Sequence, residues 1–463
     1  PPPPPRSQPR LCMKCKQNSA SLIIRVGDPF CRGCFHDYFV HKFRAMLGKN
    51  RVIFPGEKVL LALSGGPASS AMLRQVQEVR VGARVGVWVG GHSSGTPLTL
   101  CLCQGLSQKT AKKLRFVPGI VFIDEGAVRG LSLAQREQNL ARMETLLQAT
   151  GFPYYLAHLE QALELPASIL RPGPAVPSKP SPSYKEAVED FIQQQRQERG
   201  GDKDGGTSQP GTSTQDVPAA TPCLPTAAST QELLQLFDVV ETSTAREELL
   251  LMLRTHLILQ TARTKGYSKV MTGESCTRVA VKLMTNLALG RGAFLAVDTG
   301  FIDERHGDVM VVRPMREYMA KEIAFYNHYY DVPTLIVPPL STKRRENPSI
   351  HRLMERFLVG IQEDFPSSIT TVYRTGEKMS PDPAKTNIES ERCVLCLCAL
   401  DLASGEWGGG ERVLQECSRE SMGGTTGGTE ATVPASLCPH RYEGKAAVIP
   451  LLCYSCRLTF KEL

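Results

Sequence analysis

Four Cys-x-x-Cys pairs are the most chemically distinctive feature of this sequence. They lie near the two ends of the chain, at Cys12/Cys15, Cys31/Cys34, Cys393/Cys396 and Cys453/Cys456. Each pair puts two thiolates on one tight turn, and two such turns facing each other complete a tetrahedral four-sulfur zinc site. Fifteen residues separate the first two pairs, a spacing that predicts a zinc ribbon. The metal there replaces the apolar core that about thirty residues cannot build.

The two C-terminal pairs are separated by 56 residues that include a Gly/Thr-rich stretch at 423–432. If that stretch loops out, the pairs meet as a second zinc site of the same kind. Cys398, Cys438 and His440 are alternative ligands, so the sequence leaves the ligand set of this second site open. Four thiolates leave zinc no free coordination position, and both sites are therefore predicted to be structural.

The cysteine pattern also bears on the compartment of the protein. No charged-then-apolar leader follows the opening prolines, which favours metal ligation over a disulfide framework and predicts a cytoplasmic protein. The most apolar long stretch, 249–259, is too short to span a bilayer, so no membrane association is expected. The net charge of +8 favours an anionic partner.

A glycine turn at Ser64-Gly65-Gly66 is the second feature that could support chemistry. It follows the apolar run 59–63, and a helical pattern begins after Pro67. A strand, a glycine turn and a helix in this order aim backbone N–H groups and the positive end of the helix dipole at one point, which suits a phosphate. The same residues also fit a plain turn in an α/β domain. The candidate nucleotide loop consists of Ser64, Gly65, Gly66, Ser69 and Ser70.

An alternation of strands and helices must position these residues. Strand patterns are predicted at 59–63, 85–89, 119–123, 154–157, 269–273, 294–297 and 309–312, and helical patterns at 35–47, 131–147, 231–265, 278–289 and 317–330. This alternation predicts a parallel, Rossmann-like α/β sheet covered on both faces. Asp124 and Glu125 follow the third strand, at the edge where such sheets bind ligands, and fit either a ribose or metal contact or a solvated strand end.

Composition divides the chain into segments. The predicted order is a disordered proline-rich tail (1–10), a zinc ribbon with a helix (11–48), the first part of the α/β domain (49–165), a disordered insertion (166–230), the remainder of the α/β domain (231–390) and a C-terminal zinc ribbon (391–463) that contains a disordered Gly-rich insertion (401–436). The insertions are too poor in apolar residues to fold by themselves.

Together these features resemble a known family. A zinc ribbon, a strand–Ser-Gly-Gly-x-x-Ser–helix unit, a Thr-Gly-Glu strand end, an Arg-Pro-x-Arg segment and a terminal zinc ribbon occur in the order typical of the two-zinc tRNA thiolases. The resemblance covers nearly all of the chain except the insertions and implies the fold of nucleotide hydrolases with a pyrophosphatase-type loop. Active members of this family adenylate C2 of the wobble uridine in certain tRNAs and deliver sulfur to it. In the eukaryotic system, the family's sulfur source is a thiocarboxylated ubiquitin-related modifier.

The chain departs from the active members where they handle ATP and sulfur. Ala68 stands where the family's loop has aspartate, and Pro67 removes one N–H donor. The segment around 250–253 lacks the family's Cys-x-x-Cys pair, and the segment 330–345 lacks its third cysteine. Uncharged residues in Gly273-Glu274-Ser275-Cys276-Thr277 replace the paired aspartates. Cys276 is predicted to be a small buried side chain, although its place at a helix start could lower its pKa.

With these losses, the resemblance implies a non-catalytic subunit of a heterodimeric tRNA 2-thiolation complex. Its partner is a catalytic homologue that keeps the aspartate and the cysteines, ATP is not expected on this chain, and the modifier is reached through the complex. The predicted tRNA contacts are Arg313, Arg316, Lys343, Arg344 and Arg345, with Lys112, Lys113 and Arg115 as further candidates; each of them also fits a solvated surface charge.

Two alternatives stay open at the level of sequence. One is an active adenylating sulfurtransferase with an unusual loop. The other is a zinc-dependent nucleic-acid or protein interaction module, which would explain the ribbons and the positive charge but leaves the Ser-Gly-Gly turn without a role.

Overall fold

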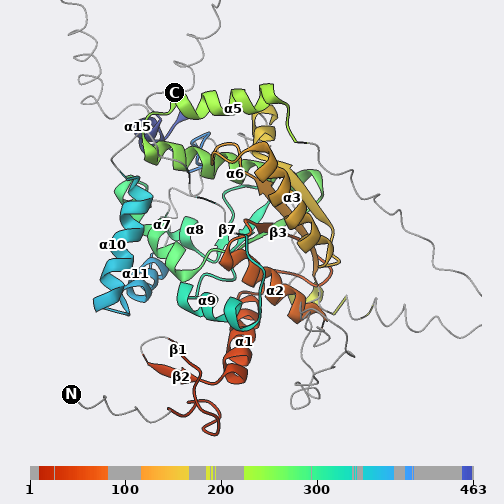
Figure 1. Cartoon of the computed structure of the whole chain (residues 1–463), viewed down its shortest axis with the longest axis vertical. Helices are drawn as coiled ribbons and strands as arrows, with labels where there is room; N and C mark the ends of the chain where they lie inside the picture. Colours follow the sequence, from red (N-terminus) through yellow and green to blue (C-terminus); the bar gives the residue numbers. More distant parts are fainter. Residues whose placement is uncertain are drawn as a thin grey trace, which may run out of the picture.

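The computed structural model describes residues 10–24, 27–81, 116–165, 184–187, 189–190, 193, 224–292, 295–335, 338, 340, 348–379, 392–398, 400 and 451–460. The elements along the chain are β1 (Leu22–Ile24), β2 (Asp28–Phe30), α1 (Arg32–Asn50), β3 (Lys58–Leu63), α2 (Pro67–Val81), β4 (Val117–Asp124), α3 (Leu133–Gln148), β5 (Tyr154–His158), η1 (Leu159–Glu164), α5 (Ala227–Val239), α6 (Ser243–Thr264), β6 (Lys269–Thr272), α7 (Cys276–Ala288), α8 (Leu295–Thr299), β7 (Ile302–Asp303), β8 (Met310–Val312), α9 (Ala320–Tyr329), α10 (Ile350–Asp364), α11 (Ser368–Glu377) and α15 (Tyr454–Thr459). Figure 1 shows their arrangement. The strand predicted at 85–89 and the Gly-rich insertion at 401–436 lie outside the described residues.

A six-stranded sheet in the order β5-β4-β3-β6-β8-β7 forms the centre of the molecule. All neighbouring strands are parallel except β7, which runs antiparallel to β8 at the edge. The central strand β3 has Leu61 opposite Ile120 of β4 on one side and opposite Met271 of β6 on the other. Strands from both sides of the 166–230 segment therefore share one sheet. The predicted α/β class with a parallel sheet is confirmed.

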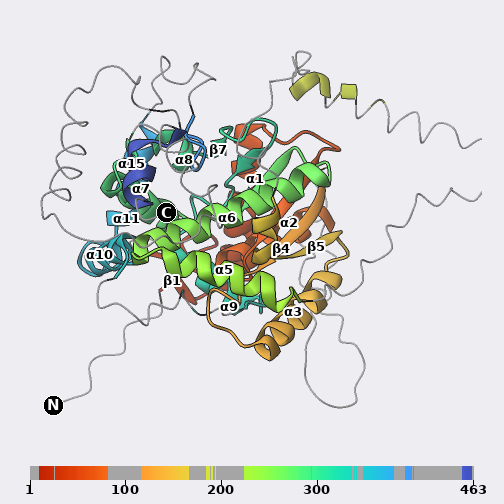
Figure 2. The same ribbon diagram turned by 90° about the horizontal axis from the view of Figure 1, so that it is seen from above.

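The two faces of the sheet are packed by different helices because successive strand side chains point in opposite directions. Leu61 and Leu63 of β3 join one apolar cluster with residues of α1, α2, α3 and α9. Leu60, between them, joins a second cluster with residues of α5, α6 and the C-terminal cysteines. In Figure 2, α5 and α6 lie together across this second side. Both faces are buried, as a parallel sheet requires.

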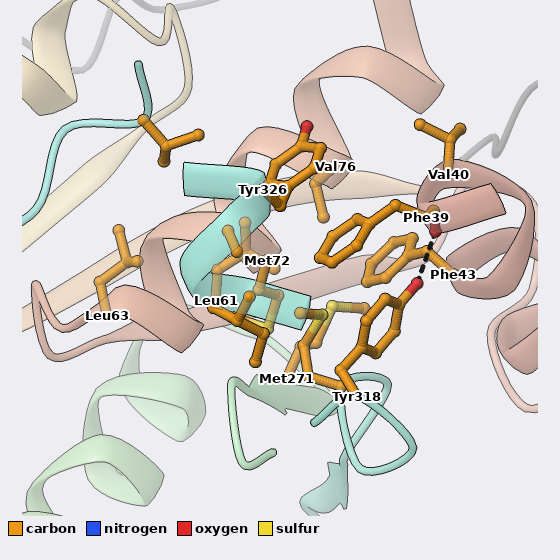
Figure 3. Close-up of a cluster of buried hydrophobic side chains, with 14 of the residues drawn as sticks. Phe39, Val40, Phe43, Leu61, Leu63, Met72, Val76, Met271, Tyr318 and Tyr326 are labelled. Atoms are coloured by element: carbon orange, nitrogen blue, oxygen red, sulfur yellow. Dashed lines mark hydrogen bonds between the residues drawn. The ribbon is translucent and has the colours of Figure 1, made fainter. Parts of the chain in front are cut away.

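Helix α1 is fixed to the body by aromatic packing, shown in Figure 3. The ring of Phe39 stacks on that of Tyr326 with centroids 4.0 Å apart. The hydroxyl of Tyr318 donates a hydrogen bond of 2.6 Å to the carbonyl of Phe39. Lys42 forms a buried ion pair of 2.8 Å with Glu322 of α9. The hairpin β1–β2 precedes this anchored helix and lies at one end of the molecule in Figure 1.

Two predicted elements are wrong. The strand predicted at 294–297 is helical from Leu295, because α8 spans Leu295–Thr299 and the edge strand β7 follows it. An apolar run of four residues does not distinguish a strand from a buried helical turn. The single helix predicted at 231–265 is two helices that break after Val239, and the Thr242 hydroxyl caps the second by accepting a hydrogen bond from the N–H of Ala245.

Among the described residues, no helix combines the length and the apolar character needed to cross a lipid bilayer.

Candidate functional site

The N-terminal cysteines form a compact four-sulfur group. The Sγ atoms of Cys12, Cys15, Cys31 and Cys34 all lie within 4.8 Å of one another. Cys31 is the N-cap of α1 and Cys34 lies in its first turn, so the helix start supplies the second knuckle. The Sγ atoms of Cys15 and Cys31 are 3.9 Å apart.

The C-terminal cysteines repeat this arrangement. Cys393, Cys396, Cys453 and Cys456 also have all four Sγ atoms within 4.8 Å, with Cys396 and Cys453 at 3.6 Å. Cys453 is the N-cap of α15, as Cys31 is of α1. Cys398 lies outside the four-sulfur group, and its Sγ accepts a hydrogen bond of 3.5 Å from Arg305. The other alternative ligands, Cys438 and His440, lie outside the described residues.

Both groups fit one tetrahedral metal ion. Zn–S bonds of about 2.3 Å in a tetrahedron place neighbouring sulfurs roughly 3.8 Å apart, close to the distances of 3.9 and 3.6 Å found here. An iron–sulfur cluster would hold its cysteine sulfurs farther apart, because the irons and sulfides lie between them. Four thiolate donors fit zinc in a structural role.

The Ser-Gly-Gly loop joins β3 to α2 as predicted, but its polar groups are largely satisfied by one another. The Ser64 hydroxyl accepts a hydrogen bond of 3.3 Å from the N–H of Gly66 and lies 3.2 Å from the Ser69 hydroxyl. The hydroxyl of Ser69 donates to the carbonyl of Gly66, and that of Ser70 donates to the carbonyl of Gly65. The structure brings all five predicted loop residues together, with Ser69 and Ser70 buried.

Leu335 packs directly over this loop. Gly65 has a φ of +74°, and a Cβ placed there would lie 2.9 Å from Leu335 Cβ and 3.0 Å from Met143 Cε. The N–H of Leu335 donates a hydrogen bond of 2.8 Å to the carbonyl of Gly65. Leu335 lies in the segment 330–345, where the resemblance implies a sulfur-handling cysteine. A buried apolar side chain therefore contacts the loop from the segment in which the resemblance implies a cysteine.

Cys276 is the first residue of α7 and is 2% exposed. Burial raises the pKa of its thiol to about 12, and the nearby cations of Lys42 and Arg316 do not overcome this cost. Its N–H donates to the carbonyl of Tyr318 at 2.8 Å. The prediction of a small buried side chain agrees with this geometry. A thiol that stays protonated at neutral pH is a poor nucleophile.

Asp124 and Glu125 are engaged in ion pairs, so neither sequence alternative holds. Asp124 accepts from Arg136 at 2.7 Å, and both side chains are buried. Glu125 pairs with Arg129 at 2.7 Å and also contacts Arg254. Burial opposes ionisation of both carboxyls, but the guanidinium groups and, for Asp124, His158 outweigh it and lower their pKa values. These charges stabilise the carboxyl edge of the sheet and leave no carboxylate free for a ribose or a metal.

Two of the predicted tRNA contacts are internal. Arg313 is buried between Glu274 and Asp303, and its Nη2 lies 3.0 Å from Asp303. Arg316 is buried and pairs with Glu377 at 2.9 Å. The prediction of phosphate contacts at these two positions is wrong, because guanidinium groups inside the protein do not reach a polynucleotide. The basic run 343–345 and the further candidates Lys112, Lys113 and Arg115 lie outside the described residues.

A cavity of 170 Å³ lies between α6, the ends of β6 and β8, and the C-terminal cysteines. Its ionised groups pair with one another: Asp298 contacts Lys282 and Arg305, and Asp303 contacts Arg305 and Arg313. The ring atom Nδ1 of His306 is buried without a hydrogen-bond partner in the described residues. Burial and the nearby arginines lower the pKa of His306 to about 4. Sequence reasoning singled out only Arg313 of this group, in the Arg-Pro-x-Arg segment, because the other members are widely spaced and belong to no motif.

The chain matches known proteins over its whole length. The family model described as cytoplasmic tRNA 2-thiolation protein 2 matches residues 349–458. Proteins of that name are 47% identical in Bos taurus and 46% identical in Homo sapiens; both alignments cover 100% of this chain, and they cover 88% and 89% of those proteins. The relative in Danio rerio is 43% identical over 98% of this chain and 88% of its own length.

One solved structure, the U34-tRNA thiolase NcsA from Methanococcus maripaludis, is similar over 80% of this chain and 87% of that one. It has 14% sequence identity and a TM-score of 0.47. These relatives agree with the resemblance inferred from the order of sequence motifs, which points to the second subunit of the cytosolic thiouridylase. The chain belongs to the cytoplasmic tRNA 2-thiolation protein 2 family.

Proposed function

We propose that this chain is a non-catalytic subunit of a cytoplasmic, heterodimeric complex that 2-thiolates the wobble uridine of tRNAs. The names of its relatives support a role in tRNA 2-thiolation and a cytoplasmic location. The catalytic partner is a homologue that keeps the loop aspartate and the sulfur-handling cysteines. Sulfur comes from a thiocarboxylated ubiquitin-related modifier, which reaches the tRNA through the complex.

The state of the Ser-Gly-Gly loop is the observation that carries the non-catalytic role. Ala68 supplies no carboxylate for magnesium, and the Ser64 hydroxyl already accepts from the N–H of Gly66. Leu335 packs over Gly65, and Cys276 is a buried thiol with a raised pKa. Phosphate binding at this loop would require Leu335 to move and the internal hydrogen bonds to break.

The two four-cysteine groups support structural zinc in this proposal. Their donor sets and distances fit a tetrahedral ion with no open position, so zinc would hold the ribbons and take no part in sulfur transfer. Metal analysis of the purified full chain should return two zinc ions per chain. Iron and labile sulfide in the same preparation would contradict this assignment.

ATP–pyrophosphate exchange tests the non-catalytic role directly. The purified chain, saturated with tRNA, should show no exchange above a no-enzyme control, and the Ala68→Asp variant should show none either because Leu335 still covers the loop. Robust exchange that a Ser64→Ala substitution abolishes would support the active sulfurtransferase instead. Unchanged 2-thiouridine in tRNA from cells depleted of this protein would support an interaction module with no part in thiolation.

A further inference from the structure

The positive charge of this protein is concentrated at one end of the chain. Residues 10–51 contain nine lysines and arginines but only two acidic residues, a net charge of +7, whereas the whole chain carries +8. The positive and negative charges of the remaining residues therefore nearly cancel. The charged segment consists of the N-terminal four-cysteine knuckles, the hairpin β1–β2 and helix α1. Figure 1 shows this part at one end of the molecule, beyond the sheet.

Basic side chains recur along one side of α1. His41 and Arg44 follow Asp37 at intervals of four and three residues, which places them on the same side of the helix. Arg51, seven residues after Arg44, is the C-cap residue directly beyond the helix, in a left-handed conformation. His41 and Arg51 are exposed and Arg44 is half-buried. At 1.5 Å per residue, the row from position 37 to position 51 extends about 21 Å along the helix.

The first cysteine knuckle extends this row. Lys14 and Lys16 flank Cys15 and are exposed. The Nζ of Lys14 lies 3.6 Å from Asp37, so this turn meets the beginning of the same α1 side. Asp37 is the only carboxylate within ion-pair distance of these five basic groups among the residues the structure describes. We call Lys14, Lys16, His41, Arg44 and Arg51 the basic face.

Small residues on the same side of α1 leave room for a ligand to approach the helix backbone closely. Gly48 lies between Arg44 and Arg51 on this face, and a Cβ built on it would meet no atom within 4 Å. Ala45 beside it is also exposed. A polynucleotide backbone can therefore approach the helix closely while lysine and arginine side chains reach its phosphates on either side. In the body, the half-buried Arg305 and the buried Arg313 are already paired with carboxylates and cannot serve in this way.

We propose that the basic face is the phosphate-binding surface of this chain and that its partner is structured RNA, which under the proposed function is tRNA. The contacts are to the phosphate backbone, because lysine and arginine rows of this kind position a nucleic acid without reading its bases. The zinc ribbon then has a second role, since it fixes Lys14 and Lys16 against α1.

The test measures the affinity of the zinc-loaded full chain for bulk tRNA by fluorescence anisotropy between 50 and 200 mM salt. The triple variant Lys14→Gln/Arg44→Gln/Arg51→Gln should weaken binding on the order of 100-fold at 0.1 M salt and reduce the slope of log K against log salt by about 2 to 3. The matched control Arg356→Gln/Arg374→Gln/Lys378→Gln removes the same charge from exposed positions of α10 and α11 and its flank. It should change affinity by less than about threefold.

Three outcomes overturn the proposal. The first is that the basic-face variant binds tRNA as the unchanged chain does, with zinc content and melting temperature preserved. The second is that the two triple variants lose equal affinity for tRNA, which would mean that only net charge matters. The third is that the basic-face variant keeps its tRNA affinity but loses the catalytic homologue in a pull-down, which would make the face a protein interface. A different measurement tests the proposed function itself: unchanged 2-thiouridine in tRNA from cells depleted of this chain would contradict that function, whatever the affinity measurements show.

Discussion

The two four-cysteine groups have the same ligands and nearly the same local geometry, yet they lie in opposite surroundings. In both, the second knuckle is a cysteine N-cap followed by a cysteine in the first helical turn. The C-terminal group belongs to the apolar cluster beneath α6, where Cys393 and Cys456 are 0% exposed. The N-terminal group lies at the other end of the molecule in Figure 1. Its Cys12 and Cys31 are also buried, but only Cys34 packs against the apolar cluster on that side of the sheet.

The charged residues around the two four-cysteine groups also differ. The N-terminal ribbon carries exposed basic residues, whereas the arginines near the C-terminal ribbon are paired with buried carboxylates. Arg291, for example, contacts both Glu248 and Ser455 of α15. One four-cysteine group is therefore part of the core of the fold, and the other presents a surface. In this chain, the same arrangement of cysteines occurs in two different settings.

The largest expected effect is the loss of a C-terminal ligand. Cys456→Ser should release one zinc ion and sharply reduce the yield of soluble protein, because the ribbon is packed into the cluster beneath α6 and structural zinc sites contribute on the order of 10 kcal/mol. Cys15→Ser should also release one zinc ion but should leave the main thermal transition within a few degrees of the unchanged chain. Metal analysis measures the zinc content of each variant, and thermal unfolding measures the shift of its transition. Equal shifts in the two variants would remove the distinction between the ribbons.

Breaking one buried ion pair should have the next largest effect. Arg305→Leu removes the cation that Asp298 and Asp303 share, while Lys282 still contacts Asp298 and Arg313 still contacts Asp303. The free energy of unfolding should therefore fall by about 1 to 3 kcal/mol. Arg51→Gln, on the exposed basic face, should change it by less than about 0.5 kcal/mol. Urea unfolding at neutral pH measures both values. A cost below 1 kcal/mol for Arg305→Leu would show that the cavity is more hydrated than its geometry implies.

A smaller effect should appear on acidification. His306 has its pKa lowered from 6.5 to about 4 by burial and nearby arginines, so the folded state disfavours the charged ring. The stabilisation is fully present above pH 6.5 and is lost as the pH falls toward 4. Between pH 7 and pH 5, His306 should account for about 2 kcal/mol of lost stability. His306→Gln should flatten this part of the pH profile, and identical slopes for the variant and the unchanged chain would contradict the lowered pKa.

Much of the architecture could be predicted from local pattern. The run Val59–Leu63 before Ser64-Gly65-Gly66 specified a strand, a turn and a helix, and the structure has all three. The spacing of Cys12, Cys15, Cys31 and Cys34 predicted a four-sulfur group because ligand geometry constrains sequence separation tightly.

Long-range packing could not be predicted in the same way. Nothing in the pattern around Leu335 indicated that it contacts Gly65, since the two residues meet only in the folded chain. Arg313 and Arg316 looked like phosphate contacts because a sequence does not show which carboxylates bury a guanidinium. The excess of basic residues in 10–51 is visible in the sequence. Their arrangement on one side of α1 became clear only from the structure, which shows the extent of the helix and the contact between Lys14 and Asp37.

Under the proposed function, this chain supplies the fold and the RNA contacts, while the chemistry resides in its partner. The most direct measurement is the 2-thiouridine content of tRNA from cells whose own copy of this protein is replaced by defined variants. A Ser64→Ala/Ser69→Ala variant of the loop should restore 2-thiouridine fully, whereas Lys14→Gln/Arg44→Gln/Arg51→Gln should not, at equal protein levels. Loss of 2-thiouridine with the loop variant and full restoration with the basic-face variant would contradict the account.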